Sequence, residues 1–111
     1  MRYIAVDIGG TQLRAALYPE TGIEAITLKA IPTVGDQPSI ERLMDLIASV
    51  WPDEDKVETI ALGVAGAVNP ATGVIYRAPN IRNWDLMPIV DVIQSRFNTR
   101  TLVGNAANLA A

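Results

Sequence analysis

The hydrophobic residues in the first third of the chain follow the pattern of short β-strands. Arg2–Ile8 is an apolar run rich in β-branched and aromatic side chains, and Gly9 and Gly10 end it, as expected for a buried strand. A second apolar run covers Leu13–Pro19, and an alternating run covers Ile23–Ile31. Because the connections between these runs are short and contain glycine, we expect an antiparallel meander of three strands.

The period of the apolar positions changes at Ser39 and predicts a first helix. From there the apolar residues recur at the spacing of one helical face. They are Ile40, Leu43, Met44, Ile47 and Val50. Ser39 is a suitable N-cap, and Pro52 prevents the helix from continuing.

The next apolar run, Val57–Gly66, has almost no polar face after Thr59. This pattern is typical of a strand in a sheet that is covered on both sides. The following residues, 67–84, are rich in turn formers and predict a loop with one short hairpin at most. Trp84 closes this loop, where we expect it to anchor the next helix and not to form a stacking platform.

A second helix is expected from Asp85, which is a good N-cap residue. Its predicted buried face consists of Leu86, Ile89, Val90, Ile93 and Phe97. Arg100–Gly104 is the last predicted strand, and the residues from Asn105 onward begin another helix.

This order of elements predicts an α/β fold, a mixed five-stranded sheet with helices packed on it. The 111 residues form a single domain without a linker, a repeat or a low-complexity segment. Ligands of such sheets usually bind beyond the strand ends. Three stretches fall there, DIGGT, GVAGAV and GNAAN.

Composition excludes several kinds of chemistry. The chain contains no Cys and no His, which excludes disulfides, thiolate nucleophiles, imidazole bases and the usual zinc ligands. The net charge is −3 and the nine basic residues are dispersed, so we expect no nucleic-acid partner. No apolar run reaches the ~18 residues of a membrane span, and the acidic Asp7 argues against a secretory leader. We expect a soluble cytoplasmic protein.

The acidic residues do not form a convincing catalytic pair. Asp53, Glu54 and Asp55 lie together in a charged stretch after Trp51 and Pro52, where a solvated turn is expected. The remaining isolated acids of the predicted helices are expected on exposed faces. They are Glu41, Asp45 and Asp91.

The stretch DIGGTQ, residues 7–12, has two interpretations. Two glycines after a strand permit positive φ angles, so successive N–H groups can form a nest for a phosphate, with Asp7 holding Mg²⁺ and Thr11 adding a hydroxyl. Alternatively, Gly9 and Gly10 form a tight hairpin turn that Asp7 initiates. The stretch matches neither a Walker loop nor a dinucleotide-binding fingerprint.

Two later stretches are equally open to alternatives. In GVAGAVNPATG, residues 63–73, small residues either let a ligand approach the backbone or serve helix–sheet packing and turns. In RAPNIRNW, residues 77–84, the amide of Asn80 either binds a sugar hydroxyl, to which it can donate and from which it can accept, or satisfies its own backbone.

Taken together, DIGGTQLRAAL, GVAGAVNPATGVIYRAPNIRNW and VGNAANLAA resemble, in order and spacing, the amino-terminal lobe of ROK-family proteins. That family contains glucokinase-like sugar kinases and related repressors. The resemblance covers nearly the whole chain and is weakest over Lys29–Val57. It implies an actin-like, ribonuclease H-like lobe.

The resemblance also implies roles for individual residues. ATP phosphates and Mg²⁺ would be contacted through the first motif, with Asp7 as the metal ligand. The residues of this cofactor-binding motif are Asp7, Gly9, Gly10, Thr11 and Gln12. Gly66 would line the sugar site, and Asn80 and Asn105 would contact the hexose.

The sequence departs from the family pattern in three places. Ala106 stands where the family carries the Asp that accepts the proton of the attacking hydroxyl. Ala65 and Ala67 occur in a stretch where Pro is common. The chain ends at Ala111, where a kinase of this family is less than half complete, so most of the nucleotide pocket would be missing. We therefore expect no catalytic residue and no kinase activity from these residues alone. ATP and Mg²⁺ would be bound by the complete family fold, and we expect neither to be bound tightly by this chain.

Other functions remain open at this stage. The chain could be half of a split kinase, with a separate carboxy-terminal lobe as partner. It could also be a non-catalytic module that forms homo-oligomers through the apolar surface of a lobe. Weak hexose binding could persist in either case. A sugar-responsive transcriptional regulator is the least expected, because such repressors carry a helix-turn-helix segment before this lobe and the first strand here starts at Arg2.

Overall fold

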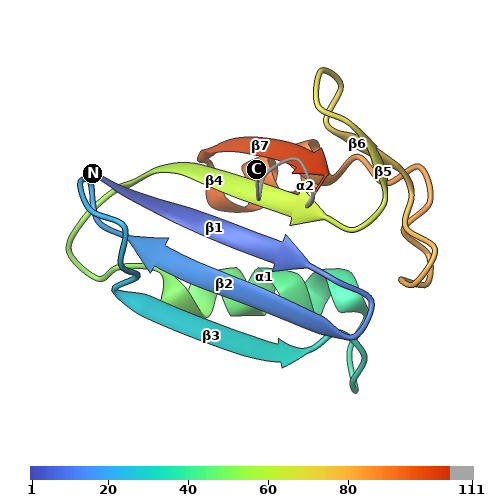
Figure 1. The fold of residues 1–111 in the computed structure, drawn as a ribbon, viewed down its shortest axis with the longest axis horizontal. Helices are drawn as coiled ribbons and strands as arrows, with labels where there is room; N and C mark the ends of the chain where they lie inside the picture. The colour runs from blue at the N-terminus through green and yellow to red at the C-terminus, as the bar shows by residue number, and fades with distance from the viewer. Residues whose placement is uncertain (106–111) are drawn as a thin grey trace.

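The computed structural model describes residues 1–105, which fold into a five-stranded sheet, two helices and a small hairpin (Figure 1). The elements of the sheet and its helices are β1 (Arg2–Ile8), β2 (Gln12–Tyr18), β3 (Thr27–Pro32), α1 (Ser39–Val50), β4 (Val57–Val64), α2 (Ile89–Phe97) and β7 (Arg100–Asn105). The hairpin consists of β5 (Ala67–Asn69) and β6 (Val74–Arg77).

The sheet is mixed, as the sequence predicts. Its strand order is β3-β2-β1-β4-β7. The pairs β1–β2 and β2–β3 are antiparallel, which confirms the meander. The pairs β1–β4 and β4–β7 are parallel. The carboxyl ends of β1, β4 and β7 therefore meet at one edge of the sheet, where ligands of such sheets usually bind.

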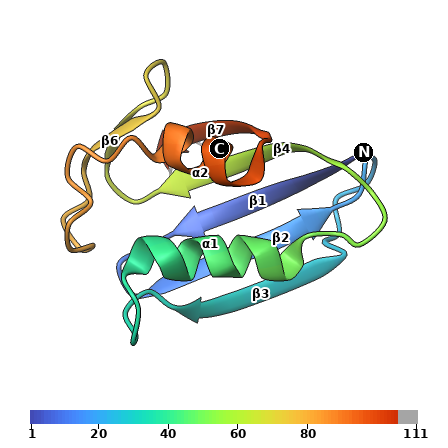
Figure 2. The same ribbon diagram turned by 180° about the vertical axis from the view of Figure 1, so that it is seen from behind.

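Both helices pack on the same face of the sheet, whereas the other face is open in the view of Figure 1 (Figures 1 and 2). The core between sheet and helices contains Ile4, Val6, Ile8, Leu43, Ile47, Ile60, Leu62, Val64, Ile89 and Ile93. Strand β4 is buried or half-buried on both faces from Thr59 to Val64, as its apolar sequence predicts. Within residues 1–105, however, helices cover only one of these faces, and the other carries the small residues Thr59, Ala61 and Gly63 beside β1 and β7.

Helix α1 has the predicted length but not the predicted cap. Ser39 is its first helical residue, and the N-cap position is occupied by Pro38. The Ser39 hydroxyl donates instead to the carbonyl oxygen of Thr33, at 2.9 Å. The helix ends at Val50, before Pro52, and its buried side chains are Leu43, Leu46, Ile47 and Val50.

Helix α2 begins four residues later than predicted, at Ile89. The preceding residues continue the hairpin, since Ile75 and Met87 exchange backbone hydrogen bonds of 2.8 and 3.0 Å. Leu86 is 71% exposed and is not part of a helix. Asp85 does not cap α2, and its carboxylate accepts a hydrogen bond from the backbone of Ala78 at 3.4 Å.

Other boundaries also shift slightly. Strand β3 starts at Thr27, and Ile23, predicted inside this strand, is 93% exposed. The hairpin β5–β6 confirms the single hairpin expected in the loop. Trp84 is buried in the core and offers no stacking platform. The helix predicted after Asn105 lies outside the described residues, as does Ala106. In the described part of the chain, no helix has the length and apolar character to cross a membrane.

Candidate functional site

The turn between β1 and β2 is a tight hairpin turn, closed by a hydrogen bond of 3.1 Å from the Gly9 N–H to the Gln12 carbonyl. The described glycines with positive φ are Gly22 and Gly73, so Gly9 and Gly10 do not adopt the backbone expected for the nest. Gly10 is required instead because a side chain at this position would clash with a neighbouring loop. A Cβ on Gly10 would lie 2.3 Å from the Cβ of Asn80. The first motif therefore packs directly against the loop that carries Asn80.

Several polar groups of this turn have no partner within residues 1–105. The backbone N–H groups of Gly10 and Thr11 donate no hydrogen bond there. The side chains of Asp7, Thr11 and Gln12 are exposed and make no hydrogen bond or ion pair with the described residues. The turn and the adjoining end of β1 thus carry a carboxylate, a hydroxyl and two N–H groups that have no partner within residues 1–105.

This donor set fits the magnesium-bound phosphates that the motif implies. Asp7 lies at the carboxyl end of β1 and lines an open hollow of about 610 Å³ on the uncovered sheet face, beside Arg14 and Gly63. Among the described residues no group of three or more His, Cys, Asp or Glu side chains is placed to hold a metal. One carboxylate is nevertheless sufficient, because Mg²⁺ usually keeps several waters and binds one or two carboxylates plus substrate phosphates.

The second and third motifs meet at the carboxyl ends of β4 and β7. The side-chain amide of Asn105 donates to the carbonyl oxygen of Gly66 at 2.7 Å. The backbone N–H of Ala65 donates to the Ile8 carbonyl at 3.2 Å, which ties this segment to β1. A Cβ on Gly66 would lie 2.3 Å from the backbone oxygen of Arg77. Close packing therefore explains the glycine at position 66.

Asn80 lies at the centre of this arrangement. It is exposed, and its side-chain amide makes no hydrogen bond with the described residues, so the alternative in which it satisfies its own backbone is wrong. A hollow of about 640 Å³ opens in the same loop, lined by Arg77, Arg82 and Asp85 among others. The predicted residues Gly66, Asn80 and Asn105 are thus gathered near the β1–β2 turn, although they lie far apart in the sequence.

One residue of this edge escaped prediction. Thr33, between β3 and α1, is 1% exposed, and its hydroxyl donates to the Gly9 carbonyl at 2.7 Å. Its backbone N–H donates to the Thr11 carbonyl at 3.0 Å. No periodicity or motif marks Thr33 in the sequence, because its partners lie more than twenty residues away.

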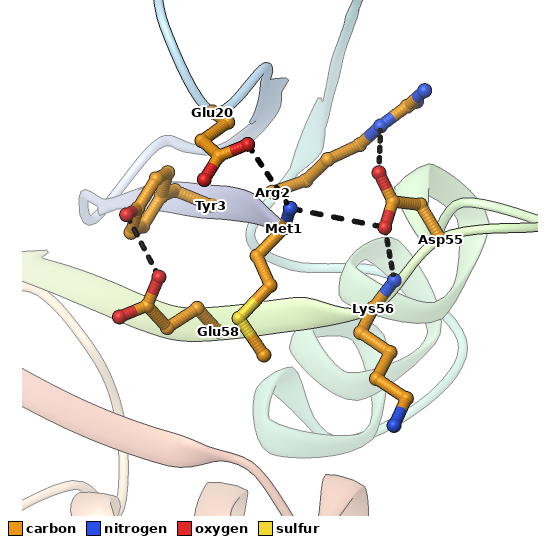
Figure 3. A network of polar contacts seen from close by, with 7 residues as sticks. All are labelled: Met1, Arg2, Tyr3, Glu20, Asp55, Lys56 and Glu58. Carbon is orange, nitrogen blue, oxygen red and sulfur yellow. Dashed lines mark hydrogen bonds and ion pairs between the residues drawn. The ribbon is translucent and has the colours of Figure 1, made fainter.

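The charged residues of the opposite edge form a separate network of exposed contacts (Figure 3). Arg2 donates to Asp55 at 3.1 Å, and the amino group of Met1 lies 3.7 Å from Glu20 and 3.9 Å from Asp55. A hydrogen bond from the Lys56 backbone holds the pKa of Asp55 below its ordinary value of 3.8. The sequence prediction of a solvated turn at this position is confirmed.

Tyr3 belongs to the same network. Its hydroxyl donates to a carboxylate oxygen of Glu58 at 2.8 Å, and this bond, together with the negative charge of the carboxylate, raises the pKa of Tyr3 above 10.0. The side chains at this edge thus engage one another, in contrast to those of the β1–β2 turn. The sequence also predicted isolated acids on the exposed faces of the helices. This prediction is confirmed for Glu41, Asp45 and Asp91.

Comparison with known proteins identifies relatives along the entire chain. A profile of the ROK family matches residues 3–111. Glucokinase of Streptomyces coelicolor is 32% identical over 97% of this chain and 33% of its own length. N-acetyl-D-glucosamine kinase of Pasteurella multocida is 32% identical over 100% of this chain and 36% of its own. The crystal structure of a ROK family glucokinase from Streptomyces griseus, in complex with glucose and AMPPNP, superposes with a TM-score of 0.79 at 30% identity, over 99% of this chain and 35% of that one.

The fold is therefore that of the actin-like ROK kinases, in which this mixed sheet recurs. The chain belongs to the ROK family. It spans about a third of the length of the relatives it matches. The fold class and the family resemblance predicted from the three motifs are both confirmed.

Proposed function

We propose that residues 1–111 are one lobe of an ATP-dependent hexose kinase and supply the sugar-binding and phosphate-binding edge of its active site. The observation that carries this proposal is the convergence of three motifs at one sheet edge. Gly10 packs on Asn80, and Gly66 accepts a hydrogen bond from Asn105. Polar side chains without partners among the described residues lie at the same edge.

In this proposal the β1–β2 turn binds the nucleotide. The carboxylate of Asp7 holds Mg²⁺, and the Thr11 hydroxyl, the Gln12 amide and the N–H groups of Gly10 and Thr11 orient the phosphates. When bound, Mg²⁺ neutralises negative charge on the phosphoryl group being transferred. Gly9 and Gly10 contribute by having no side chain that would obstruct this approach.

The hexose binds beside this turn. Asn80 donates to and accepts from sugar hydroxyls, which suits an amide with both functions. Asn105, whose side-chain amide donates to the Gly66 carbonyl, lies beside Gly66 and contacts the sugar at the same place. The backbone at Gly66 forms the floor of this site. Two of the relatives are named as kinases of glucose and of N-acetyl-D-glucosamine, so we propose a hexose or amino-hexose substrate.

The isolated chain is proposed to be inactive. Ala106, which lies outside the described residues, has no group that can accept the proton of the attacking hydroxyl. Loss of a general base costs roughly 10²–10⁴-fold in rate. Phosphoryl transfer depends mainly on positioning and electrostatics, and residues 1–111 would provide these from one side only.

A chimera tests this proposal. Residues 1–111 carrying Ala106→Asp would replace the matching first third of the Streptomyces coelicolor glucokinase. ATP-dependent glucose phosphorylation is expected, and the same chimera with Ala106 should be slower by roughly 10²–10⁴-fold. Asp7→Asn in the active chimera should abolish activity. A folded chimera that is inactive with Asp at position 106 would contradict the proposal.

In a split form of this proposal, a separate carboxy-terminal lobe is the partner. Mixing the chain that carries Ala106→Asp with the remaining two thirds of the same glucokinase should then restore activity. Failure of the two chains to associate in sedimentation experiments would exclude the split form and leave the fused chimera as the relevant test. From the composition and charge of the sequence, we propose that the protein acts in the cytoplasm and that it binds neither nucleic acid nor a membrane.

A second candidate function is a non-catalytic module that forms homo-oligomers. The open sheet face favours it, since Leu28 and Leu102 are 58% and 47% exposed there, and contiguous exposed apolar surface is typical of interaction sites. Light scattering at high protein concentration should then report a dimer or a larger species, and Leu28→Glu should reduce its mass. A monomer at all concentrations would rule out this function. A transcriptional regulator remains the least favoured alternative.

A further inference from the structure

In the β1–β2 turn, two carbonyl oxygens accept hydrogen bonds from Thr33, whereas two N–H groups have no acceptor among the described residues. The Gly9 carbonyl accepts from the Thr33 hydroxyl at 2.7 Å, and the Thr11 carbonyl accepts from the Thr33 N–H at 3.0 Å. The N–H groups of Gly10 and Thr11, by contrast, donate to no group within residues 1–105. A single buried residue thus engages the carbonyl oxygens of Gly9 and Thr11, while the N–H groups of Gly10 and Thr11 have no partner within residues 1–105.

The bond to Gly9 also fixes the direction of a neighbouring N–H group. All described peptide bonds are trans, and in a trans peptide the C=O and the following N–H point in opposite directions. Because the Gly9 carbonyl points toward Thr33, the Gly10 N–H of the same peptide plane points away from Thr33. Glycine has little intrinsic preference among backbone conformations, so this orientation depends on hydrogen bonds, namely the bond from the Gly9 N–H to the Gln12 carbonyl and the bond from Thr33 to the Gly9 carbonyl.

Thr33 is itself held from its other side. Its carbonyl oxygen accepts from the hydroxyl of Ser39, the first residue of α1, at 2.9 Å. Thr33 is 1% exposed, and no described buried side-chain polar atom lacks a partner. The chain of hydrogen bonds therefore runs from the start of α1 through Thr33 to the turn.

We propose that Thr33 is a positioning residue for phosphate binding: it holds the turn carbonyls away from the ligand and presents the Gly10 N–H to a nucleotide phosphate. This inference rests on the proposed function, in which the β1–β2 turn binds Mg·ATP. An unheld carbonyl turned toward the phosphate would repel it, since both groups are hydrogen-bond acceptors. Thr33 makes no contact with the ligand in this scheme and acts only through the turn.

The test compares two variants of the full 111-residue chain. Thr33→Val removes the hydroxyl with little change in shape, and Thr33→Ser retains it. Mg·ATP is titrated into each isotopically labelled protein, and the amide resonances of Gly10 and Thr11 are followed by NMR. We expect Thr33→Val to weaken Mg·ATP binding about tenfold, the effect of one lost hydrogen bond and an unsatisfied carbonyl, and Thr33→Ser to bind within about twofold of the parent.

Glucose titration of the same variants separates positioning from general stability. The glucose affinity of folded Thr33→Val should match the parent, because its bonds reach the phosphate turn and not the Asn80 side chain. Equal loss of both affinities, or folded Thr33→Val with parental Mg·ATP affinity, would overturn the inference and leave the proposed function standing. If the parent chain shows no response to Mg·ATP, the same variants are compared in the glucokinase chimera that carries Ala106→Asp, where Thr33→Val should raise the KM for ATP about tenfold and leave the KM for glucose unchanged. An unchanged KM for ATP in the chimera would overturn the inference, and an inactive parent chimera would overturn the proposed function.

A variant at Ser39 keeps the test decisive if Thr33→Val does not fold. Ser39→Ala removes the donor to the Thr33 carbonyl but leaves both bonds from Thr33 to the turn. It should weaken Mg·ATP binding by about twofold to threefold, less than one complete hydrogen bond. The Ser39→Ala protein could instead keep both the parental Mg·ATP affinity and the parental hydrogen-exchange rate of the Gly10 amide. This result would contradict the proposed role of the hydrogen bonds that run from Ser39 through Thr33 to the turn.

Discussion

The two edges of the sheet use their polar residues in opposite ways. At the amino ends of β1 and β4, side chains pair with one another in exposed contacts, such as Arg2 with Asp55 and Tyr3 with Glu58 (Figure 3). At the carboxyl ends, the bonds that hold the loops run from Thr33 and Asn105 to backbone carbonyls. The Asp7 and Asn80 side chains make no hydrogen bond there with the described residues.

This difference leaves polar groups of the carboxyl edge available for the ligands proposed to bind there. Exposed ion pairs contribute little to stability, so the network at the amino edge mainly satisfies its own charges. Backbone-directed bonds and close glycine contacts instead fix the loops of the carboxyl edge without using the groups proposed to bind ligand. The predictions below perturb one edge or the other, in order of decreasing effect.

The largest effect is expected at Gly10. In Gly10→Ala, a Cβ would lie 2.3 Å from the Cβ of Asn80 and 3.0 Å from its backbone oxygen, so the two loops must separate. Overpacking of this kind costs about 1–3 kcal/mol, and thermal unfolding should show the loss. Gly35→Ala is the matched control, because its Cβ would meet the guanidinium at the end of the Arg42 side chain and no backbone atom. The guanidinium can move aside at the cost of its exposed bonds to the Pro32 carbonyl, so a smaller loss is expected. Equal losses in the two variants would contradict the role of backbone contact at Gly10.

A smaller effect is expected at Asn105. Asn105→Asp keeps the shape but replaces the amide donor to the Gly66 carbonyl with an acceptor. A lost bond with an unsatisfied partner costs about 1–3 kcal/mol, at the lower end here because the side chain is only partly buried. Urea unfolding should place this variant between Gly10→Ala and the parent. Unchanged stability would indicate that Asn105 does not hold the second motif in place.

At the opposite edge, Asp55→Asn should change stability only slightly and in a pH-dependent way. The pKa of Asp55 is lowered in the folded state, so its contribution is present above the unfolded value of about 3.8 and is lost as the pH falls through the lower folded value. Melting temperatures should therefore differ at pH 7 and converge at acid pH. A difference that grows on acidification would contradict this assignment.

The smallest effect is expected for Tyr3→Phe. The folded-state pKa of Tyr3 is raised above 10.0, so its bond to Glu58 stabilises the fold below about pH 10 and is lost as the pH rises through the folded value. A small difference in melting temperature at pH 8 should vanish in strong alkali. The glucose response of the carboxyl edge should be unaffected, and a change there would contradict the independence of the two edges.

The sequence predicted the sheet well because apolar periodicity is a local property that burial preserves. The prediction failed where tertiary contacts determine the local structure. Asp85 looks like an N-cap, but the bridge between Ile75 and Met87 extends the hairpin and delays α2 to Ile89. The glycine pair suggested positive φ, whereas the need for space against Asn80 explains Gly10. Such contacts join distant segments and leave no periodic signal.

The residues of the candidate site could be predicted because they belong to short sequence motifs. The residue that supports the site, Thr33, could not. Asp7, Asn80 and Asn105 belong to short motifs whose order and spacing can be compared with a family. Thr33 belongs to no motif, and its bonds reach Gly9 and Thr11 only after the meander has folded. The groups proposed to bind ligands are thus visible in the sequence, whereas Thr33, proposed to orient them, becomes visible only in three dimensions.

The central claim is that the carboxyl edge is the sugar-binding and phosphate-binding half of a hexose kinase site. Its most direct test is a titration of the labelled chain with glucose to tens of millimolar, followed by amide NMR. We predict shifts at Gly10, Gly66, Asn80 and Asn105, loss of these shifts in Asn80→Ala, and no shifts at Tyr3 or Glu58. No movement at the carboxyl edge, or equal movement at both edges, would contradict the claim.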